Sequence, residues 1–481
     1  MTSCFDVSYD VVVVGGGNAA LSAALSAKQS GAKVLVIEKA PPIERGGNCP
    51  FTGGGFRFAH NGTSDLRRIV LDHSVLKGNE NAYTPEQYRS DMLTKTRGLT
   101  NRALLATLIE QSLPTISWLS DLGITFERGS NAQRVGAGAM GSGPGLIKMY
   151  YDIARRQGID IVYETKMVEL IQNPMGTVNG IIVRNKDGTQ QISAKGIVLA
   201  CGGFEASTEM RYSYLGPHWK RARVRGSQFN TGDGHRAGMA IGAATTGQWN
   251  GYHGTPIDFD APFSGSVTTV HQLPRRSYNL GIMLNLNGDR FTDEGEGMGS
   301  DNFAHIADKI LQQPDNLAFQ IFDQKVIQLI DTQYLTSTPT VSDSIESLGA
   351  KLTMDLIGMG NTIREFNSSV QEGNFDPTIL DGKCTNNISP KKTNWALKID
   401  TPPFYAYKVT GGITYTFGGL KIDTRAQVLS TNGKAIHGLF ATGEIVGGFF
   451  YHDSLRASGL MHGAVFGRIA GINAARLAGY E

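Results

Sequence analysis

Residues 11–40, which read VVVVGGGNAALSAALSAKQSGAKVLVIEKA, restrict the possible folds of this chain more than any other segment. Four β-branched residues followed by Gly15 predict a parallel strand that is buried on both faces. A helix is expected from residue 18 to about residue 30, where Gly31 ends it, and residues 33–37 predict a second strand. A strand, a glycine turn, a helix and a strand in this order are typical of a dinucleotide-binding β-α-β unit.

The glycine turn and the acid that follows the second strand each have an expected role. Gly15 permits the tight turn, Gly17 permits close approach of a pyrophosphate, and Ala20 permits close packing of helix on strand. Asn18 and Ala19 open the helix, whose free N–H groups and dipole favour an anion. Glu38 lies where a carboxylate accepts hydrogen bonds from ribose hydroxyls and repels a 2′-phosphate, which disfavours NADP. These residues alone leave open whether the ligand is a nicotinamide dinucleotide or a flavin.

Length and charge limit the classes of function. A chain of 481 residues suits two domains, or one domain with an insertion. The formal net charge of +2 gives no field that would attract nucleic acid, so a small-molecule partner is expected. Cys4, Cys49, Cys201 and Cys384 are scattered without a CxxC pair, and no zinc site, other metal site or disulfide framework is expected. No secretion signal or membrane-length apolar run is found, and a cytoplasmic location is expected.

Two later segments favour a flavin dinucleotide, which stays bound, over a nicotinamide dinucleotide. Residues 195–204, KGIVLACGGF, and residues 438–448, GLFATGEIVGG, predict strands that return to the same sheet far along the chain. Such repeated returns suit an extended dinucleotide. After Glu444, the segment that begins at Ser458 with Gly459 would place a helix N-terminus against a flavin ring.

These residues resemble a known family, the flavoprotein subunits of fumarate reductase and succinate dehydrogenase with their relatives, which include 3-ketosteroid dehydrogenases and tricarballylate dehydrogenase. The matching pieces run in the family's order over almost the whole chain: VVVVGGGNAALSAAL, EKAPPIERGGNCPFTGGG, IVLACGGFEAS, TGDGHRAG, LNLNGDRFTDEGE, GLKIDTRAQV, HGLFATGEIVGG and GAVFGRIAG. The likeness is nearest to the tricarballylate dehydrogenase branch. It implies FAD, and an α/β fold in which a Rossmann-like FAD-binding domain of the glutathione-reductase type carries an inserted α+β cap domain.

The resemblance also implies the cofactor contacts. Glu38 and Lys39 are expected at the adenosine end, Arg45 to Asn48 and Thr52 to Gly54 at the pyrophosphate and flavin, Asp233 nearby, and Glu444 at the ribityl chain. The full expected set is Gly15, Gly17, Asn18, Ala19, Ala20, Glu38, Lys39, Ala40, Arg45, Gly46, Gly47, Asn48, Thr52, Gly53, Gly54, Val168, Ala200, Cys201, Gly202, Asp233, Gly443, Glu444, Ser458, Gly459 and Leu460. Several relatives attach FAD covalently through a histidine of the loop that here reads GGNCPFTGGG. Because this loop has no histidine, noncovalent FAD is predicted.

The same likeness sets the expected domains. The FAD-binding domain is expected over residues 1–249 and 406–481, with a helical insertion at about 60–160 that contains two amphipathic runs. A cap domain is expected over residues 250–405, with strand signals in GIMLNLNG and LAFQIFD and a helix in TIREFNSSV. In the family, the cap covers the flavin and keeps water from it.

Candidate catalytic residues come from comparison with the family's motifs. His253 matches the histidine that begins the cap and binds a substrate carboxylate, and Glu294 matches an acid beside the proton route. Tyr415 stands where fumarate reductases have the histidine of HTMGG, and Ile327 where they have a proton-donating arginine. The segment FFYHDSLRA replaces the family's NRLGG region and supplies the further candidates, which are Tyr451, His452 and Arg456. Arg456 is expected to clamp an anion, and Tyr415 is expected to act as the acid or base.

The expected function is an FAD-dependent oxidoreductase acting on CH–CH groups, which forms or reduces a C=C bond beside a carboxylate or ketone. The departures from HTMGG and NRLGG weigh against fumarate reduction itself. Two alternatives stay open: a 3-ketosteroid Δ1-dehydrogenase-like enzyme, and a flavin-binding protein without catalysis. No CxxCH or iron–sulfur cysteine run is present, so electrons are expected to pass to a separate acceptor or to O2.

Overall fold

The computed structural model describes residues 6–76, 78, 80–128, 136–298 and 302–480. The chain divides into two compact units. The first contains the described residues up to Met210, Ser227–Tyr252 and the described residues from Tyr415 onward, and the second contains Arg211–Gly226 and the described part of His253–Thr414. No helix within these ranges is both long enough and apolar enough to cross a bilayer.

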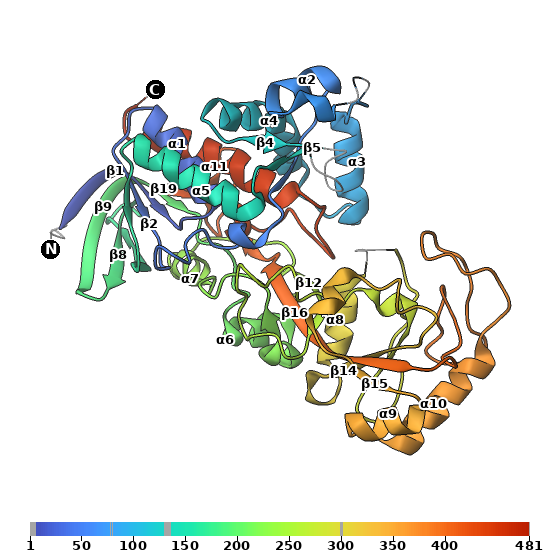
Figure 1. Cartoon of the computed structure of the whole chain (residues 1–481). Coiled ribbons are helices and arrows are strands. Elements are labelled where there is room, and N and C mark those ends of the chain that lie inside the picture. The colour runs from blue at the N-terminus through green and yellow to red at the C-terminus, as the bar shows by residue number, and fades with distance from the viewer. Residues whose placement is uncertain (1–5, 77, 79, 129–135, 299–301, 481) are drawn as a thin grey trace. The chain divides into compact units, whose positions relative to one another are not determined.

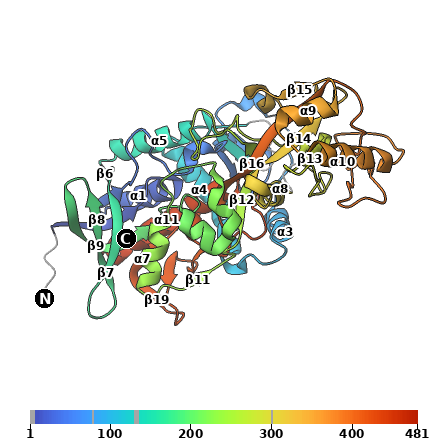
Figure 2. The same ribbon diagram turned by 90° about the horizontal axis from the view of Figure 1, so that it is seen from below.

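The first unit is built on a largely parallel sheet with the strand order β18-β19-β9-β1-β2-β6. Its strands are β1 (Val7–Val14), β2 (Val34–Ile37), β6 (Asp160–Val162), β7 (Lys166–Gln172), β8 (Val178–Asn185), β9 (Gly188–Leu199), β18 (Gln427–Leu429) and β19 (Ala435–Ala441). β1 pairs in parallel with both β2 and β9, and β19 pairs in parallel with β9. The carboxyl ends of these four strands therefore lie at one edge of the sheet. β8 pairs antiparallel with both β7 and β9, and the three strands lie together in Figure 2.

Helices cover this sheet, and two short sheets complete the unit (Figure 1). The helices are α1 (Asn18–Gln29), α2 (Thr63–Ile69), α3 (Pro85–Lys95), α4 (Arg102–Asp121), α5 (Ser142–Arg156), α6 (Thr208–Met210), α7 (Asp233–Ala240) and α11 (Ser458–Leu477), with the short turns η1 (Cys49–Phe51), η2 (His73–Val75) and η10 (Gly443–Ile445). β3 (Gly55–Arg57), β4 (Phe126–Glu127) and β5 (Gly136–Ala139) form one short sheet, and β11 (Thr245–Thr246) and β17 (Gly419–Leu420) form the other.

The β1–α1–β2 segment follows from its residues. Val11, Val12 and Val13 are fully buried, as expected of a central parallel strand covered on both faces. The strand starts earlier than its valine run, at Val7, because residues 7–9 pair with β9 although none of them is buried. Helix α1 spans Asn18–Gln29, and Gly31 follows it with φ +97°.

Close packing of α1 on α11 depends on glycine. A Cβ at Gly467 would lie 2.5 Å from the carbonyl oxygen of Ala19, and one at Gly471 would lie 2.1 Å from that of Ala23. Both distances are far below van der Waals contact, so any side chain would separate the helices. Gly467 and Gly471 thereby allow α11 to lie against α1, with the N-termini of the two helices side by side.

The expected helical region around residues 60–160 contains α2, α3, α4 and α5. Thr84 begins α3 with a capping box, in which its side chain accepts a hydrogen bond from the N–H of Gln87 and the Gln87 side chain accepts one from the N–H of Thr84. The Asn101 side chain caps α4. Both helices contribute buried apolar residues to the core of the first unit, which accounts for their amphipathic sequence.

The second unit contains a mixed sheet with the strand order β10-β16-β14-β13, and β12 and β15 also pair with β16. Its strands are β10 (Arg223–Val224), β12 (Tyr252–Asp258), β13 (Ile282–Leu284), β14 (Ala318–Phe322), β15 (Thr340–Ser342) and β16 (Phe404–Thr416). Its helices are α8 (Phe303–Leu311), α9 (Ile345–Leu352) and α10 (Leu356–Ser369), with the short turns η4 (Arg211–Leu215), η5 (Pro217–Arg221), η6 (Ser277–Leu280), η8 (Pro314–Asn316) and η9 (Thr332–Thr336). This is an α+β arrangement in which α9 and α10 pack on the apolar face formed by β13 and β14.

Candidate functional site

The glycine turn after β1 leaves no room for side chains. A Cβ at Gly15, where φ is +114°, would lie 2.3 Å from the carbonyl oxygen of Ala200. A Cβ at Gly16 would lie 2.4 Å from a carboxylate oxygen of Glu38. The turn therefore packs directly on the residues that follow β9 and β2, and only glycine fits there.

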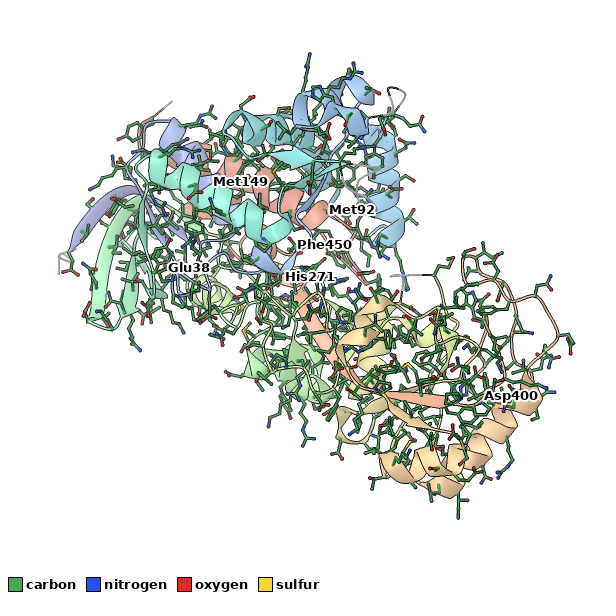
Figure 3. All side chains as sticks on the ribbon, in the orientation of Figure 1. Glu38, Met92, Met149, His271, Asp400 and Phe450 are labelled. Atoms are coloured by element: carbon green, nitrogen blue, oxygen red, sulfur yellow. The ribbon has the colours of Figure 1, made fainter. Side chains whose placement is uncertain are left out.

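Glu38 follows β2 and is almost fully buried (Figure 3). Its Oε1 accepts a hydrogen bond of 2.8 Å from the backbone N–H of Ala40. Burial raises the pKa of Glu38, and backbone N–H groups that include those of Gly16 and Gly46 oppose the rise. The carboxyl group is held at the carboxyl end of the sheet by local backbone, in the position expected for a ribose-binding acid.

Lys39 is bound to a polar cluster at the start of α7. Its ammonium lies 2.9 Å from Asp233 and also donates to Thr231 at 2.6 Å. Lys166 and Arg236 contact the other carboxylate oxygen of Asp233, at 2.9 Å and 2.8 Å. Burial alone would raise the pKa of Asp233, but the hydrogen bonds and charges of the two lysines lower it to about 2. Val168 lies on β7 two residues beyond Lys166, so the expected contacts Lys39, Asp233 and Val168 come from neighbouring elements.

The loop after Glu38 carries the expected pyrophosphate and flavin contacts. Arg45 stacks on the ring of Tyr151 at 4.4 Å, and Gly46 and Gly47 adopt positive φ. Thr52 accepts a hydrogen bond of 3.1 Å from the N–H of Gly54. A Cβ at Gly53 would meet no atom within 4 Å, so open space lies beside this glycine.

Two acids meet at the ends of β9 and β19. The Glu205 and Glu444 carboxyl groups lie close enough for Glu205 to raise the pKa of Glu444. Asn48 donates from Nδ2 to both, at 2.7 Å and 3.2 Å, and Asn230 donates to Glu205 at 2.6 Å. Thr416 donates its N–H to Glu444 at 2.9 Å.

Burial and mutual repulsion oppose the ionisation of these two acids. Burial raises the pKa of Glu205, and burial followed by repulsion from Glu205 raises that of Glu444. Two adjacent buried carboxyls cannot both ionise cheaply, so a shared proton is expected. Sequence reasoning found Glu444 but missed Glu205. Glu205 directly follows CGGF after β9, and Glu444 follows β19 in a similar way. This shared position is the signal in the sequence that could have identified Glu205.

The residues at this edge fit a bound flavin dinucleotide. Helices α1 and α11 begin with Gly17 and Ala457 as N-caps, neither of which supplies a capping side chain, and neither helix has an acid in its first turn. Asn18 joins the two ends by donating from Nδ2 to the carbonyl of Leu460 at 2.7 Å. A Cβ at Gly459 would also meet no atom within 4 Å. Two uncapped N-termini beside open glycines suit an anionic, elongated ligand.

The remaining expected contacts follow the same strand ends. Ala200, Cys201 and Gly202 come directly after β9, and the N–H of Ala200 donates to the carbonyl of Val14. Gly443 opens η10 with φ +79°. Ser458 is fully buried at the start of α11, and its hydroxyl accepts a hydrogen bond from the hydroxyl of Tyr88. Cys49, Cys201 and Cys384 are free thiols, and Cys4 lies outside the described residues.

Tyr415 lies at the end of β16, in the first unit. Its hydroxyl is hydrogen-bonded to Ser454, and its ring packs near those of Phe417 and Phe450, the latter labelled in Figure 3. Burial raises the pKa of Tyr415 well above its usual value. At neutral pH the side chain is therefore a neutral phenol, which donates a proton more readily than it accepts one.

The loop that carries Arg456 is anchored at both ends. Lys95 forms an ion pair of 2.8 Å with Asp453, and Arg57 donates to the carbonyl oxygen of Arg456 at 2.9 Å. The Arg456 side chain is exposed, and within the described residues its guanidinium forms no hydrogen bond or ion pair. A fixed backbone with an unpaired guanidinium suits the binding of an anion.

Two further residues of this segment, His452 and Tyr451, differ in exposure. His452 is exposed with φ +63°, and burial followed by the charge of Arg97 lowers its pKa. Its backbone N–H donates to Gln248 at 2.6 Å. Tyr451 is half-buried. The structure thus brings Tyr415, Tyr451, His452 and Arg456 into one unit, on β16 and the segment before α11.

His253 and Glu294 belong to the second unit. His253 lies on β12 and is half-buried. Glu294 is fully buried, pairs with Arg290 at 2.5 Å, and accepts the N–H of Met283 at 2.8 Å. These contacts give Glu294 a structural role in joining the turn after β13 to that strand. Among the described residues, no group of three or more histidines, cysteines or acids is placed to bind a metal ion.

Comparison with known proteins identifies the family. A family profile described as an FAD binding domain matches residues 10–460. Among curated proteins, a probable fumarate reductase of Shewanella frigidimarina, Ifc3, is 31% identical over 97% of this chain and 74% of its own length. A flavocytochrome c3 fumarate reductase in its open conformation matches with a TM-score of 0.77 and 29% identity, over 98% of this chain and 79% of that one.

A 3-ketosteroid Δ1-dehydrogenase from Sterolibacterium denitrificans matches with a TM-score of 0.72 over 98% of this chain and 99% of that one. At 20% identity this likeness concerns the fold alone. The expected fold class, the expected cofactor FAD and the expected oxidoreductase class are confirmed. The chain belongs to the family of the FAD binding domain and is a homologue of the fumarate reductase flavoproteins.

Proposed function

We propose that this protein is an FAD-dependent reductase of a C=C bond that is conjugated to a carboxylate. The observation that carries the proposal is the likeness to a fumarate reductase over 97% of the chain at 31% identity. The motifs RGGNCPFTGG, RFTDEGE and SGLMHGAVFGR favour the tricarballylate dehydrogenase branch, so acids with more than one carboxylate are the first substrates to test. The reverse reaction, dehydrogenation, uses the same groups.

The domain and cofactor details are part of this proposal. The first unit would be the FAD-binding domain, and the cap domain would cover residues 250–405. FAD would be held without a covalent bond, since the loop at residues 46–55 offers no histidine. Glu38 would contact the ribose, Glu444 the ribityl chain, and the starts of α1 and α11 the pyrophosphate and flavin. The protein would work in the cytoplasm with a separate electron donor or acceptor, or with O2.

Bound FAD supplies or accepts the hydride, and the side chains of this chain would handle the proton and the substrate. Tyr415 would donate its phenolic proton to the substrate carbon, because a phenol is protonated at neutral pH and can act as a general acid. Ser454 would then donate a hydrogen bond to the phenolate that remains. The exposed guanidinium of Arg456 would bind the carboxylate and polarise the double bond next to it. His452 and Tyr451 would support this contact.

The test uses the absorbance of the flavin in the absence of oxygen. The purified protein is reduced with one equivalent of dithionite and then mixed with fumarate, with an unsaturated tricarboxylic acid, or with a steroid enone. Return of the oxidised flavin band with an acid, and formation of the saturated acid, are the expected results. Return of the band with the steroid alone would support the ketosteroid alternative. If no compound reoxidises a flavin that dithionite reduces normally, the protein is a flavin-binding protein without this activity.

A matched pair of variants assigns the proton donor. Tyr415→Phe removes the proposed donor, whereas Tyr212→Phe removes an exposed hydroxyl of the second unit. Only Tyr415→Phe is expected to slow reoxidation by the acid. Equal rates in the two variants would remove Tyr415 from the mechanism.

A further inference from the structure

Helix α3 is bound to the segment 449–457, which precedes α11, through one of its faces. Tyr88 and Lys95 lie two helical turns apart on α3 and therefore on the same side of the helix. The hydroxyl of Tyr88 donates to that of Ser458 at 3.2 Å, and the ammonium of Lys95 forms an ion pair of 2.8 Å with Asp453. All of these residues belong to the first unit. Helix α3 thus contacts this segment at a charged position as well as at its end.

Asp453 connects the ion pair to Tyr415. Its Oδ2 contacts the ammonium of Lys95, and its Oδ1 accepts the backbone N–H of Ser454 at 2.7 Å. The hydroxyl of Ser454 is hydrogen-bonded to that of Tyr415. Asp453 and Ser454 are both buried, whereas the side chain of Lys95 is 21% exposed. These contacts form a continuous series from the ammonium of Lys95 to the phenol of Tyr415.

The charge of Asp453 lies close enough to Tyr415 to affect its ionisation. Burial raises the pKa of Tyr415, the hydrogen bond with Ser454 opposes the rise, and Asp453 and Glu444 add to it. The proposed reduction breaks the phenolic O–H bond, forms a C–H bond on the substrate, and leaves a negative charge on Tyr415 until solvent returns a proton. A carboxylate repels this phenolate, and a cation paired with the carboxylate reduces the repulsion. The ammonium of Lys95 therefore favours the step in which Tyr415 loses its proton.

The backbone of the same segment is also anchored without the ion pair. At its start, the hydroxyl of Thr100 donates to the carbonyl of Phe449 at 2.9 Å. Near its end, the guanidinium of Arg57 donates to the carbonyl of Arg456 at 2.9 Å. Loss of the ion pair is therefore expected to change the local charge more than the course of the backbone.

We propose that Lys95 and Asp453 are positioning residues for proton transfer by Tyr415. The ammonium of Lys95 offsets the charge of Asp453, and Asp453 holds Ser454 beside the phenol. The proposal rests on the proposed function, in which Tyr415 is the proton donor, and it adds a residue of the helical insertion to the groups that serve the reaction. Neither residue was singled out in the sequence, because α3 matches no motif of the family and lies far from Tyr415 along the chain.

Stopped-flow reoxidation of the dithionite-reduced flavoprotein by fumarate and by aconitate separates the effect of charge from that of anchoring. Lys95→Met is expected to lower the rate at saturating acid by about tenfold or more, with an unchanged half-saturating concentration. The double variant Lys95→Met/Asp453→Asn is expected to recover a rate within about threefold of the wild-type rate. The reason is that a neutral amide does not repel the phenolate and still accepts the N–H of Ser454. The control is Lys148→Met, which removes an exposed lysine 2.7 Å from Asp152 and is expected to leave the rate unchanged.

A double variant that is as slow as Lys95→Met would overturn the proposal, since the ion pair would then serve only as an anchor. A wild-type rate in Lys95→Met would overturn it as well. If Lys95→Met does not fold, Asp453→Asn alone decides the question: an equal or faster rate supports the proposal, and a loss of about tenfold or more refutes it.

Two outcomes separate this proposal from the proposed function. If Tyr415→Phe slows reoxidation but Lys95→Met does not, the role of the ion pair fails and Tyr415 stays the donor. If neither acid reoxidises the reduced flavin of the wild-type protein, the proposed function fails and the role of Lys95 and Asp453 fails with it.

Discussion

The buried pair Glu205–Glu444 makes a prediction about stability and pH. The perturbation is Glu205→Gln, which keeps an oxygen that accepts the hydrogen bonds of Asn48 and Asn230 but removes one ionisable group. We expect this variant to lose the pH dependence that the pair gives to the free energy of unfolding. At pH 5 the free energy of unfolding of Glu205→Gln should equal that of the wild-type protein or lie below it. As the pH rises, this difference should shrink or change sign.

The sign follows from the direction of the pKa shifts. Burial raises the pKa of both carboxyls in the folded protein, whereas in the unfolded chain a glutamate titrates at about 4.3. Above that pH the folded pair retains a proton that the unfolded chain has released. The free energy of unfolding therefore falls as pH rises, and the contribution is fully present only below the unfolded pKa.

The magnitude follows from one retained proton. Each retained proton gives a slope of about 1.4 kcal/mol per pH unit. Between pH 5 and pH 7 the wild-type protein should thus lose up to about 2.7 kcal/mol relative to Glu205→Gln. The free energy of unfolding of Glu205→Ala should differ from that of the wild-type protein and from that of Glu205→Gln. It leaves the amides of Asn48 and Asn230 without this acceptor, and each unsatisfied buried donor costs about 1–3 kcal/mol at every pH.

The assay is urea unfolding at pH 5, 6 and 7 with a fixed excess of FAD. Glu110→Gln, which alters an exposed acid of α4, is the control and should follow the wild-type profile. Glu444→Gln should remove the same slope, since the two residues share the proton. Parallel pH profiles of the wild-type protein and Glu205→Gln would refute the shared proton.

Three further predictions concern packing and the proposed chemistry. Gly471→Val places a Cβ where Ala23 O lies at 2.1 Å, so urea unfolding should show a loss of about 1–3 kcal/mol, and an unchanged midpoint would contradict the tight α1–α11 contact. Tyr415→Phe should slow reoxidation of the reduced flavin by an acid substrate by about 10²–10⁴-fold at unchanged FAD content, as measured by stopped-flow absorbance; a wild-type rate would exclude Tyr415 as the donor. Arg456→Ala should weaken binding of an acidic substrate by more than tenfold, or about 1.4 kcal/mol, in a calorimetric titration, and undiminished affinity would remove Arg456 from the clamp.

Much of the first unit could be predicted because its signals are local. The valine run, the glycine turn and Glu38 lie within residues 11–40, and each is explained by contacts among those residues and the strand ends beside them. The start of α11 at Ser458 was also correctly placed. The start of β1 was not, because residues 7–10 are only partly buried and lack the apolar run that marks the rest of the strand.

The sites that were missed depend on distant partners. Glu205 accepts a hydrogen bond from Asn48 across 157 positions, and it raises the pKa of Glu444 in η10. A single sequence gives no indication of which polar residues tertiary pairing brings together, so the contacts of Glu205 could not be found by motif or spacing. The role of Glu294 is clearer in the structure, since its ion pair with Arg290 is fully buried.

The proposed chemistry depends on FAD that is held at the carboxyl edge of the parallel sheet without a covalent bond. The most direct measurement is acid precipitation of the purified protein, with chromatography of the supernatant and the mass of the polypeptide. The account predicts one FAD released per chain and a polypeptide with the mass of its unmodified sequence. A flavin that stays with the precipitated chain would contradict noncovalent binding, and release of NAD in place of FAD would contradict the cofactor.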